Sequence, residues 1–465
     1  MNIRVKFLGA AGEVTGSKYL LQIDEFNLLL DCGLFQGRKQ LQNLNWSEFP
    51  IDPASIDAVV LTHAHLDHTG YLPRLFRQGY RGPVYCTTAT ADLMNLILMD
   101  SAKIQVEEAR YAKKKGYSEH EDPQPLYTPD DVATIADYLE TTVFEKPVRI
   151  TENISADFFN AGHILGAAIV ELTVRGEHET KKIVFSGDLG RSNDPILYPP
   201  HIISQADVLF VESTYGDREN TATPREEILE MMNATFERDG NLIIPAFAIG
   251  RTQNLLIYIK NILYSKEIPN VRVVVDSPMS ISATEFYRKH QNYHKLRGVD
   301  LDEDESFMNL RKYLTVVHSS EESKKVNEMK HDTIIIASSG MMTGGRILHH
   351  LINRLPNPDN VVMISGYQAE GSRGRRLQDG EESIRIYGQD VPVRAKIFNI
   401  KGLSGHADRS ELLHWLDGFK HPPQMTFVVH GEKGSAGALC ETLKSKGWNA
   451  HVPHYLETVE LFKHI

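Results

Sequence analysis

The chain has 465 residues, of which 41% are hydrophobic and 24% charged, as in an ordinary globular protein long enough for two or three domains. Its formal net charge of -11 excludes a bulk positive field for nucleic acid, so a polyanion must meet a local patch or a bound metal. Three widely spaced cysteines, Cys32, Cys86 and Cys440, exclude a disulfide framework and favour a reducing, cytoplasmic location.

The first half of the chain predicts short strands joined by tight turns. The N-terminus runs directly into a strand-like pattern, so we expect neither a signal peptide nor a membrane span. A helix is expected over 70–79, and longer helical patterns with charged faces fill 91–145. Strand patterns occur at 3–9, 18–23, 27–33, 57–63, 155–166, 167–174, 181–190 and 206–216.

The strand expected at 57–63 leads directly into the sequence HAHLDH. His63, His65, Asp67 and His68 fall in the loop that follows this buried strand, where all four side chains can turn toward one point. Imidazole nitrogens and carboxylate oxygens suit zinc, and without a thiolate the site keeps positions open for water. The alternative, a loop that is rich in histidine by chance, is disfavoured by the strand and helix on either side.

From about residue 221 the pattern changes to an alternation of helices and strands, which is typical of a parallel sheet. Helices are expected at 226–240 and 251–263, with strands at 241–247, 271–278, 333–340 and 361–366. At about 394 the short-strand style returns, with strands at 394–400 and 426–432 and helices at 410–419 and 435–447. The predicted organisation is a first domain made from 1–210 and 394–465, with 211–393 inserted into it.

Further ligands must come from other strand ends, since one short cluster cannot enclose two metals. His163 in NAGHILGA and Asp188 in FSGDLG are the candidates, because flanking glycines let the backbone approach closely. Taken alone, each would more often be structural; in this order after HAHLDH, both are expected to be ligands.

In these features the chain resembles the metallo-β-lactamase superfamily, whose motifs match in order: Asp31 in LLLDCG, then HAHLDH, His163 and Asp188. The resemblance implies two zinc ions per chain, one bound by His63, His65 and His163, the other by Asp67 and His68, with Asp188 bridging both. Asp31 is expected to orient ligands without binding a metal itself. The alternative role for Asp31 is that of an ordinary turn residue after a strand.

Later motifs resemble the β-CASP branch of this superfamily, which processes nucleic acids. They are VESTYGD with Glu212, IPAFAIGRTQNLL, VVVDSPMS, ASSGMMTGGR, GLSGHAD with His406, and VVHGE with His430. The resemblance implies an α/β fold, namely an αββα sandwich with an inserted α/β domain that contains a parallel sheet. It also makes His430 the remaining ligand of the second metal and Glu212 and His406 a polar pair beside the metals. We expect neither the N-terminal RNA-binding extension of archaeal forms nor the long C-terminal domain of ribonuclease J.

The resemblance predicts a zinc-dependent ribonuclease for single-stranded RNA, in which hydroxide formed between the two metals attacks phosphorus. Products would carry a 5′-phosphate and a 3′-hydroxyl, and His406, oriented by Glu212, would protonate the departing oxygen. The residues expected to serve catalysis are Asp67, Glu212 and His406. Endonuclease and 5′-exonuclease modes both stay open, as do a homo-oligomer and DNA as substrate, because nothing identifies a reader of the 2′-hydroxyl.

Contacts to nucleic acid are expected mainly from the inserted region. The strand before SSGMMTGGR ends in a loop of small residues whose amides can form a phosphate nest. The run RGRR at 373–376 is equally compatible with a phosphate rail and with a solvated loop. The predicted contacts are Arg251, Ser338, Ser339, Gly340, Arg346 and Ser404.

Two other function classes compete with a ribonuclease. A small-molecule hydrolase of the superfamily, such as a thioesterase or lactonase, needs no large inserted domain. A catalytically weak RNA-binding scaffold would show gaps among the ligands, whereas the seven ligand positions of the resemblance all carry suitable side chains.

Overall fold

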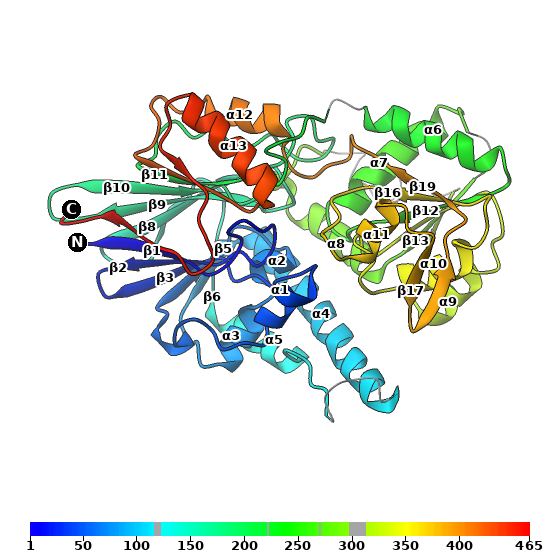
Figure 1. Cartoon of the computed structure of the whole chain (residues 1–465), viewed down its shortest axis with the longest axis horizontal. Helices are drawn as coiled ribbons and strands as arrows, with labels where there is room; N and C mark the ends of the chain where they lie inside the picture. The colour runs from blue at the N-terminus through cyan, green and yellow to red at the C-terminus, as the bar shows by residue number, and fades with distance from the viewer. Residues whose placement is uncertain (116–121, 221–222, 269–270, 297–312) are drawn as a thin grey trace. The chain divides into compact units, whose positions relative to one another are not determined.

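The computed structural model describes residues 1–115, 122–220, 223–268, 271–296 and 313–465. They form two compact units (Figure 1). The first unit contains Met1–Asn193, Tyr198–Glu219 and His406–Ile465, and the second contains Asp194–Leu197 and Asn220–Gly405. No helix in the described part of the chain is long and apolar enough to cross a membrane.

In the first unit, the described strands form two seven-stranded sheets. The order in one sheet is β22 (Thr458–Phe462), β1 (Ile3–Phe7), β2 (Tyr19–Ile23), β3 (Phe26–Leu30), β4 (Ala58–Val60), β5 (Val84–Thr87) and β6 (Leu139–Thr142). The order in the other is β21 (Ala450–His451), β20 (Met425–Val429), β11 (Val208–Glu212), β10 (Thr180–Phe185), β9 (Ala168–Arg175), β8 (Ile154–Asn160) and β7 (Val148–Arg149).

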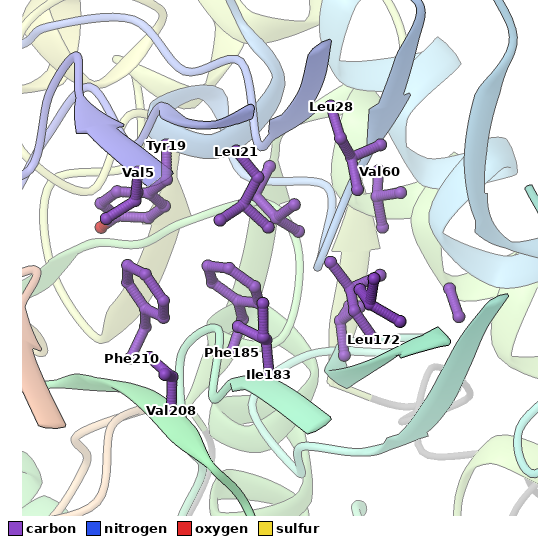
Figure 2. Close-up of a cluster of buried hydrophobic side chains, with 14 of the residues drawn as sticks. Val5, Tyr19, Leu21, Leu28, Val60, Leu172, Ile183, Phe185, Val208 and Phe210 are labelled. Carbon is purple, nitrogen blue, oxygen red and sulfur yellow. The ribbon is translucent and has the colours of Figure 1, made fainter. Parts of the chain in front are cut away.

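The core of this unit lies between the two sheets. Figure 2 shows Val5, Tyr19 and Leu21 on one side of the core and Phe185 and Phe210 on the other. Alternate residues of a strand point to the same face, so β1 buries Ile3, Val5 and Phe7 while the residues between them are more exposed. The rings of Phe185 and Phe210 are stacked, with 4.2 Å between their centroids.

Helices cover the outer faces of both sheets. Helix α4 (Thr88–Lys115) packs on β5 and β6, and α13 (Lys433–Ser445) packs on β20 and β21. The predicted αββα sandwich is therefore confirmed (Figure 1). The remaining helices of this unit are α1 (Lys39–Leu44), α2 (Leu66–Thr69), α3 (Leu72–Arg77), α5 (Pro129–Ile135) and α12 (Arg409–Leu416), with short 3-10 turns at Pro53–Ser55 and Ala136–Tyr138.

The second unit contains the predicted parallel sheet. Its order is β14 (Leu314–Val316), β13 (Arg272–Asp276), β15 (Thr333–Ala337), β12 (Asn241–Pro245), β16 (Val361–Ile364) and β19 (Lys396–Asn399), and all neighbouring pairs are parallel. Its other elements are α6 (Pro224–Phe236), α7 (Arg251–Tyr264), α8 (Pro278–Lys289), a 3-10 turn at Gln291–Tyr293, α9 (Ser320–Val326), α10 (Ile347–Arg354), α11 (Arg373–Gln378) and the hairpin of β17 (Ser383–Ile386) and β18 (Gln389–Pro392).

Two segments differ from the sequence-based expectations. Residues Leu139–Thr142, placed within helical patterns, form the edge strand β6, whose polar sequence LETT carries no strand-like alternation. Strand β19, expected to belong with the first domain, pairs with β16 in the sheet of the second unit. The pattern of a short edge strand does not encode which sheet it joins. The three-part domain organisation stays a proposal, and the compact units place 394–405 in the second unit.

Candidate metal centre

The side chains of the predicted centre follow the carboxyl ends of several strands in the first unit. His63 comes shortly after β4, His163 after β8, Asp188 after β10 and His430 directly after β20, while Glu212 is the last residue of β11. Strands β10, β11 and β20 are parallel neighbours, so their carboxyl ends meet at one edge of the sheet. Side chains that are far apart in the sequence are thereby brought together.

The first donor set consists of three imidazoles and one carboxylate oxygen. His65 Nδ1 lies 3.1 Å from His63 Nε2 and 3.1 Å from His163 Nε2. Asp188 Oδ2 lies 3.4 Å from His63 Nε2 and 3.5 Å from His163 Nε2. His63, His163 and Asp188 are buried, and all four donor atoms lie within 4.8 Å of one another.

The second donor set surrounds the other oxygen of the same aspartate. His68 Nε2 lies 3.1 Å from His430 Nε2 and 3.3 Å from Asp188 Oδ1. Asp67 Oδ2 lies 3.4 Å from His430 Nε2 and 4.0 Å from His68 Nε2. Asp188 thus offers one oxygen to each set. The structure brings together all seven residues predicted as ligands.

The two donor sets fit divalent metal ions. With Zn–N bonds of about 2.0–2.1 Å, neighbouring ligand atoms of a tetrahedral site lie roughly 3.3 Å apart, close to the spacings in the first set. Asp188 Oδ1 is buried and accepts no hydrogen bond from the described residues, although such an oxygen costs free energy unless it is paired. A bound cation would satisfy it.

Hydrogen bonds from neighbouring polar side chains fix the direction of three imidazoles. The carboxylate of Asp31 accepts a bond from His68 Nδ1 at 2.8 Å, which leaves Nε2 for a metal. The hydroxyl of Thr62 lies 3.1 Å from His63 Nδ1 and also donates to Asp31, and the hydroxyl of Thr214 lies 3.1 Å from His430 Nδ1. Sequence reasoning missed both threonines, although their places beside His63 and in ESTYG could have indicated them.

The electrostatics of the site favour neutral imidazoles in the first donor set and an ionised Asp188. Burial lowers the pKa of His63 to about 3 and that of His65 to about 4, so both keep a free lone pair at neutral pH. Burial opposes ionisation of Asp188, but the neighbouring His430 and His68 hold the pKa of its carboxyl well below the ordinary value. These are the protonation states that a metal ligand requires. In the second donor set, burial opposes the charge of His68, but Asp188 and Asp31 raise its pKa well above the ordinary value, so a metal that binds there must displace a proton.

Glu212 and His406 form a polar pair beside the first donor set. His406 Nδ1 lies 3.2 Å from Glu212 Oε1 and 4.0 Å from Asp188 Oδ2, and its ring is 4.5 Å from that of His163. Burial lowers the pKa of His406, but the charge of Glu212 and the hydrogen bond to it dominate and raise the value to about 9. His406 therefore carries a proton at neutral pH, as a general acid must.

The predicted nucleic-acid contacts lie in the second unit. Ser338, Ser339, Gly340 and Arg346 share the loop after β15, and Arg251 begins α7 after the neighbouring strand β12. The guanidinium of Arg346 is ion-paired with the fully buried Asp276 at 2.5 Å. Ser404 is buried and lies outside this loop, two residues before His406.

The run RGRR lies in the short helix α11 (Arg373–Gln378), in which two of its three arginines are paired with nearby acidic residues. Arg375 pairs with Asp379 and Arg376 with Glu381, at 3.0 and 2.5 Å. Arg373 donates to the carbonyl oxygens of Arg385 and Thr343. The structure therefore favours a solvated helix over a phosphate rail at this place.

Comparisons with known protein families cover most of the chain. Residues 20–211 match a metallo-beta-lactamase superfamily domain, 252–377 a Beta-Casp domain, and 390–453 a Zn-dependent metallo-hydrolase RNA specificity domain. The last range contains both His406 and His430.

Similar proteins extend over almost the whole chain. A Thermus thermophilus protein named as a ribonuclease is 36% identical over 98% of this chain and 100% of its own length. A transcription termination factor of Methanocaldococcus jannaschii is 34% identical, covering 95% of this chain and 69% of that protein. An RNase J-like protein of the same organism is 31% identical over 95% of both chains. A solved Enterococcus faecalis structure of unknown function shares the fold, with a TM-score of 0.52, 13% identity, and 99% of this chain and 100% of that one covered.

Proposed function

Because this chain belongs to the β-CASP family of metallo-β-lactamase-fold hydrolases, we propose that it is a ribonuclease that hydrolyses phosphodiester bonds of single-stranded RNA with two zinc ions. The observation that carries this proposal is the shared Asp188, whose two oxygens each face one imidazole-rich donor set. Full-length similarity to a protein named as a ribonuclease supports RNA as the substrate class.

The proposed site residues have distinct roles. His63, His65 and His163 would hold one ion, Asp67, His68 and His430 the other, and Asp188 would bind both. Ions held there would lower the pKa of a water shared between them and neutralise the oxygens of the phosphate under attack. Asp31, Thr62 and Thr214 keep the imidazoles in the orientation that binding needs.

The polar pair would serve the leaving group. The water oxygen forms a bond to phosphorus while the bond from phosphorus to the 3′-oxygen breaks, which leaves a 5′-phosphate downstream and a 3′-hydroxyl upstream. His406 would donate its proton to the departing 3′-oxygen, and Glu212 would hold the ring and stabilise its positive charge. Glu212 is itself fixed, since the backbone amide of Leu189 donates to its Oε1 at 2.7 Å.

RNAs labelled at either end, with a 5′-phosphate or a 5′-triphosphate, test the function and its mode. We expect cleavage of RNA but no turnover of a thioester by the zinc-loaded protein. Internal fragments indicate an endonuclease, and mononucleotides released from the 5′ end indicate an exonuclease. Thioester turnover without RNA cleavage would contradict the proposal and support the small-molecule hydrolase class.

Arg251→Ala and Arg346→Ala test the proposed phosphate contacts. Each replacement is expected to weaken RNA binding for all sequences and to flatten the slope of log affinity against log salt, by roughly 0.7 for each lost contact. Filter binding or fluorescence anisotropy between low and moderate salt measures this slope.

Arg385→Ala, at an exposed position of the hairpin strand β17, is the matched control and should leave the salt slope unchanged. Thermal unfolding must accompany Arg346→Ala, because the variant leaves the buried Asp276 without this ion pair. Unchanged slopes in both variants would remove these arginines from the contact surface.

A further inference from the structure

The loop that carries Asp188 also contacts the segment that carries His406. This loop follows β10, and its Leu189 makes two backbone hydrogen bonds to the region of the polar pair. The Leu189 amide donates to Glu212 Oε1 at 2.7 Å, and the Leu189 carbonyl oxygen accepts from the Ala407 amide at 2.7 Å. The neighbours of His406 and its carboxylate partner are thus attached to one residue of the Asp188 loop.

A second attachment lies three residues farther along the loop and involves Glu411. Its Oε1 accepts hydrogen bonds from the Ser192 amide at 3.0 Å and from the Ser192 hydroxyl at 2.7 Å. Its Oε2 accepts from the Asp408 amide at 3.0 Å and lies 2.5 Å from Arg191 Nε in an ion pair. Arg191 is only 8% exposed and Glu411 16% exposed, so this ion pair is largely shielded from water.

Glu411 does more than cap its helix. It belongs to the capping box at the start of α12, in which Asp408 accepts from the Glu411 amide. In the capping boxes of α5 and α9, the acidic residues Asp131 and Glu322 bond to groups at or next to their own helix start. A cap requires no arginine from a distant loop, so the largely buried ion pair with Arg191 and the bonds from Ser192 call for another explanation.

We propose that Arg191 and Glu411 are positioning residues that hold His406 in place against Glu212, by joining the Asp188 loop to the start of α12. His406 lies just before two anchored residues, Ala407 and Asp408, so its backbone is fixed relative to the loop that also holds the bridging aspartate. This inference rests on the proposed general-acid role of His406. The new element is that the position of the His406 ring depends on the ion pair between Arg191 and Glu411, which belongs to neither donor set.

Glu411→Gln removes the negative charge of the ion pair and can keep the cap, because its one amide oxygen can take the place of Oε2 and accept from the Asp408 amide. The bond from the Ser192 amide to the other oxygen is then lost, since an NH2 group stands there. We expect kcat on ordinary RNA to fall about tenfold to a hundredfold, the range that a displacement near 1 Å can produce, while KM and zinc content stay unchanged. On RNA with sulfur as the scissile 3′-bridging atom, most of the loss should disappear, because a thiolate leaves without protonation. Asp417→Asn, at the other end of α12 in an exposed pair with Lys446, is the matched control and should keep wild-type rates on both substrates.

The double variant Glu411→Gln, His406→Ala supplies an independent readout. Positioning predicts that it is no slower than His406→Ala alone, because the group to be positioned is gone. Two results would overturn the proposal. In the first, the loss of rate in the double variant equals the product of the losses in the two single variants. In the second, sulfur restores the rate of His406→Ala, but Glu411→Gln is slowed equally on both substrates. If His406→Ala slows both substrates equally, the general-acid role fails, and the double variant alone then decides whether Glu411 positions His406. Should Glu411→Gln unfold, Ser192→Ala removes only the hydroxyl contact of the same carboxylate, keeps the contact from the backbone amide, and is judged by the same comparisons.

Discussion

Asp188→Ala is expected to remove bound zinc and nearly all RNA cleavage. Wild-type protein should carry about two zinc ions per chain and lose activity to a strong chelator, as a two-metal site requires. Asp188 faces both donor sets, so its loss should disturb both ions at once. Changes around the ligands of a metal typically cost about 10–100-fold in affinity or activity, and removal of a shared ligand should exceed that range. Elemental analysis of the purified variant and initial cleavage rates measure the two effects.

Two comparison variants make this result interpretable. His430→Ala should mainly weaken the second ion, because His430 Nε2 lies 3.1 Å from His68 Nε2 in the second set only. Asp157→Ala should keep full zinc content and activity, because Asp157 lies on β8 and belongs to neither donor set. It is a matched control, since it also removes a partly buried carboxylate, whose pKa is raised by burial and by Glu171. Full zinc content and full activity in Asp188→Ala would refute the bridging assignment.

His406→Ala is expected to slow RNA cleavage by about a hundredfold to ten-thousandfold, the usual contribution of a general acid. The variant should keep its zinc, because the proposed role of His406 involves no metal ligation. Nδ1 faces Glu212 Oε1 at 3.2 Å, and the proton that reaches the leaving oxygen would come from the other ring nitrogen. Single-turnover cleavage with saturating enzyme measures the chemical step.

A substrate with sulfur in place of the scissile 3′-bridging oxygen tests the role directly. The ratio of wild-type to variant rate should be much smaller on this substrate than on ordinary RNA. Ratios are needed because sulfur also changes affinity for zinc, and the zinc content of each variant must be checked. Equal ratios on both substrates with zinc retained would assign His406 to phosphate positioning and require another source of the proton.

The sequence allowed the residues of the two donor sets to be predicted because they belong to motifs in a fixed order along the chain. His63, His65, Asp67 and His68 are adjacent, so a strand followed by a loop was enough to predict their convergence. His430 follows His68 by 362 residues, and it entered the prediction only through resemblance to a family. Their geometry then follows from strands that end at one edge of a sheet.

Other features could not be predicted because they depend on which loops meet. Ser192 and Glu411 are 219 residues apart, and neither lies in a sequence pattern that names its partner. The edge strands β6 and β19 are short, and β6 carries polar residues that a solvated loop would also carry. In both cases the missing information is long-range contact, which local periodicity does not contain.

The order of the donors along the chain also has a consequence for the protein during its synthesis. Ribosomes add about 5–20 residues per second, so the 362 residues between His68 and His430 take on the order of tens of seconds. Throughout that time a nascent chain carries the first donor set's early histidines but cannot assemble the second set. Until His430 has been synthesised, the growing chain therefore lacks the complete pair of donor sets.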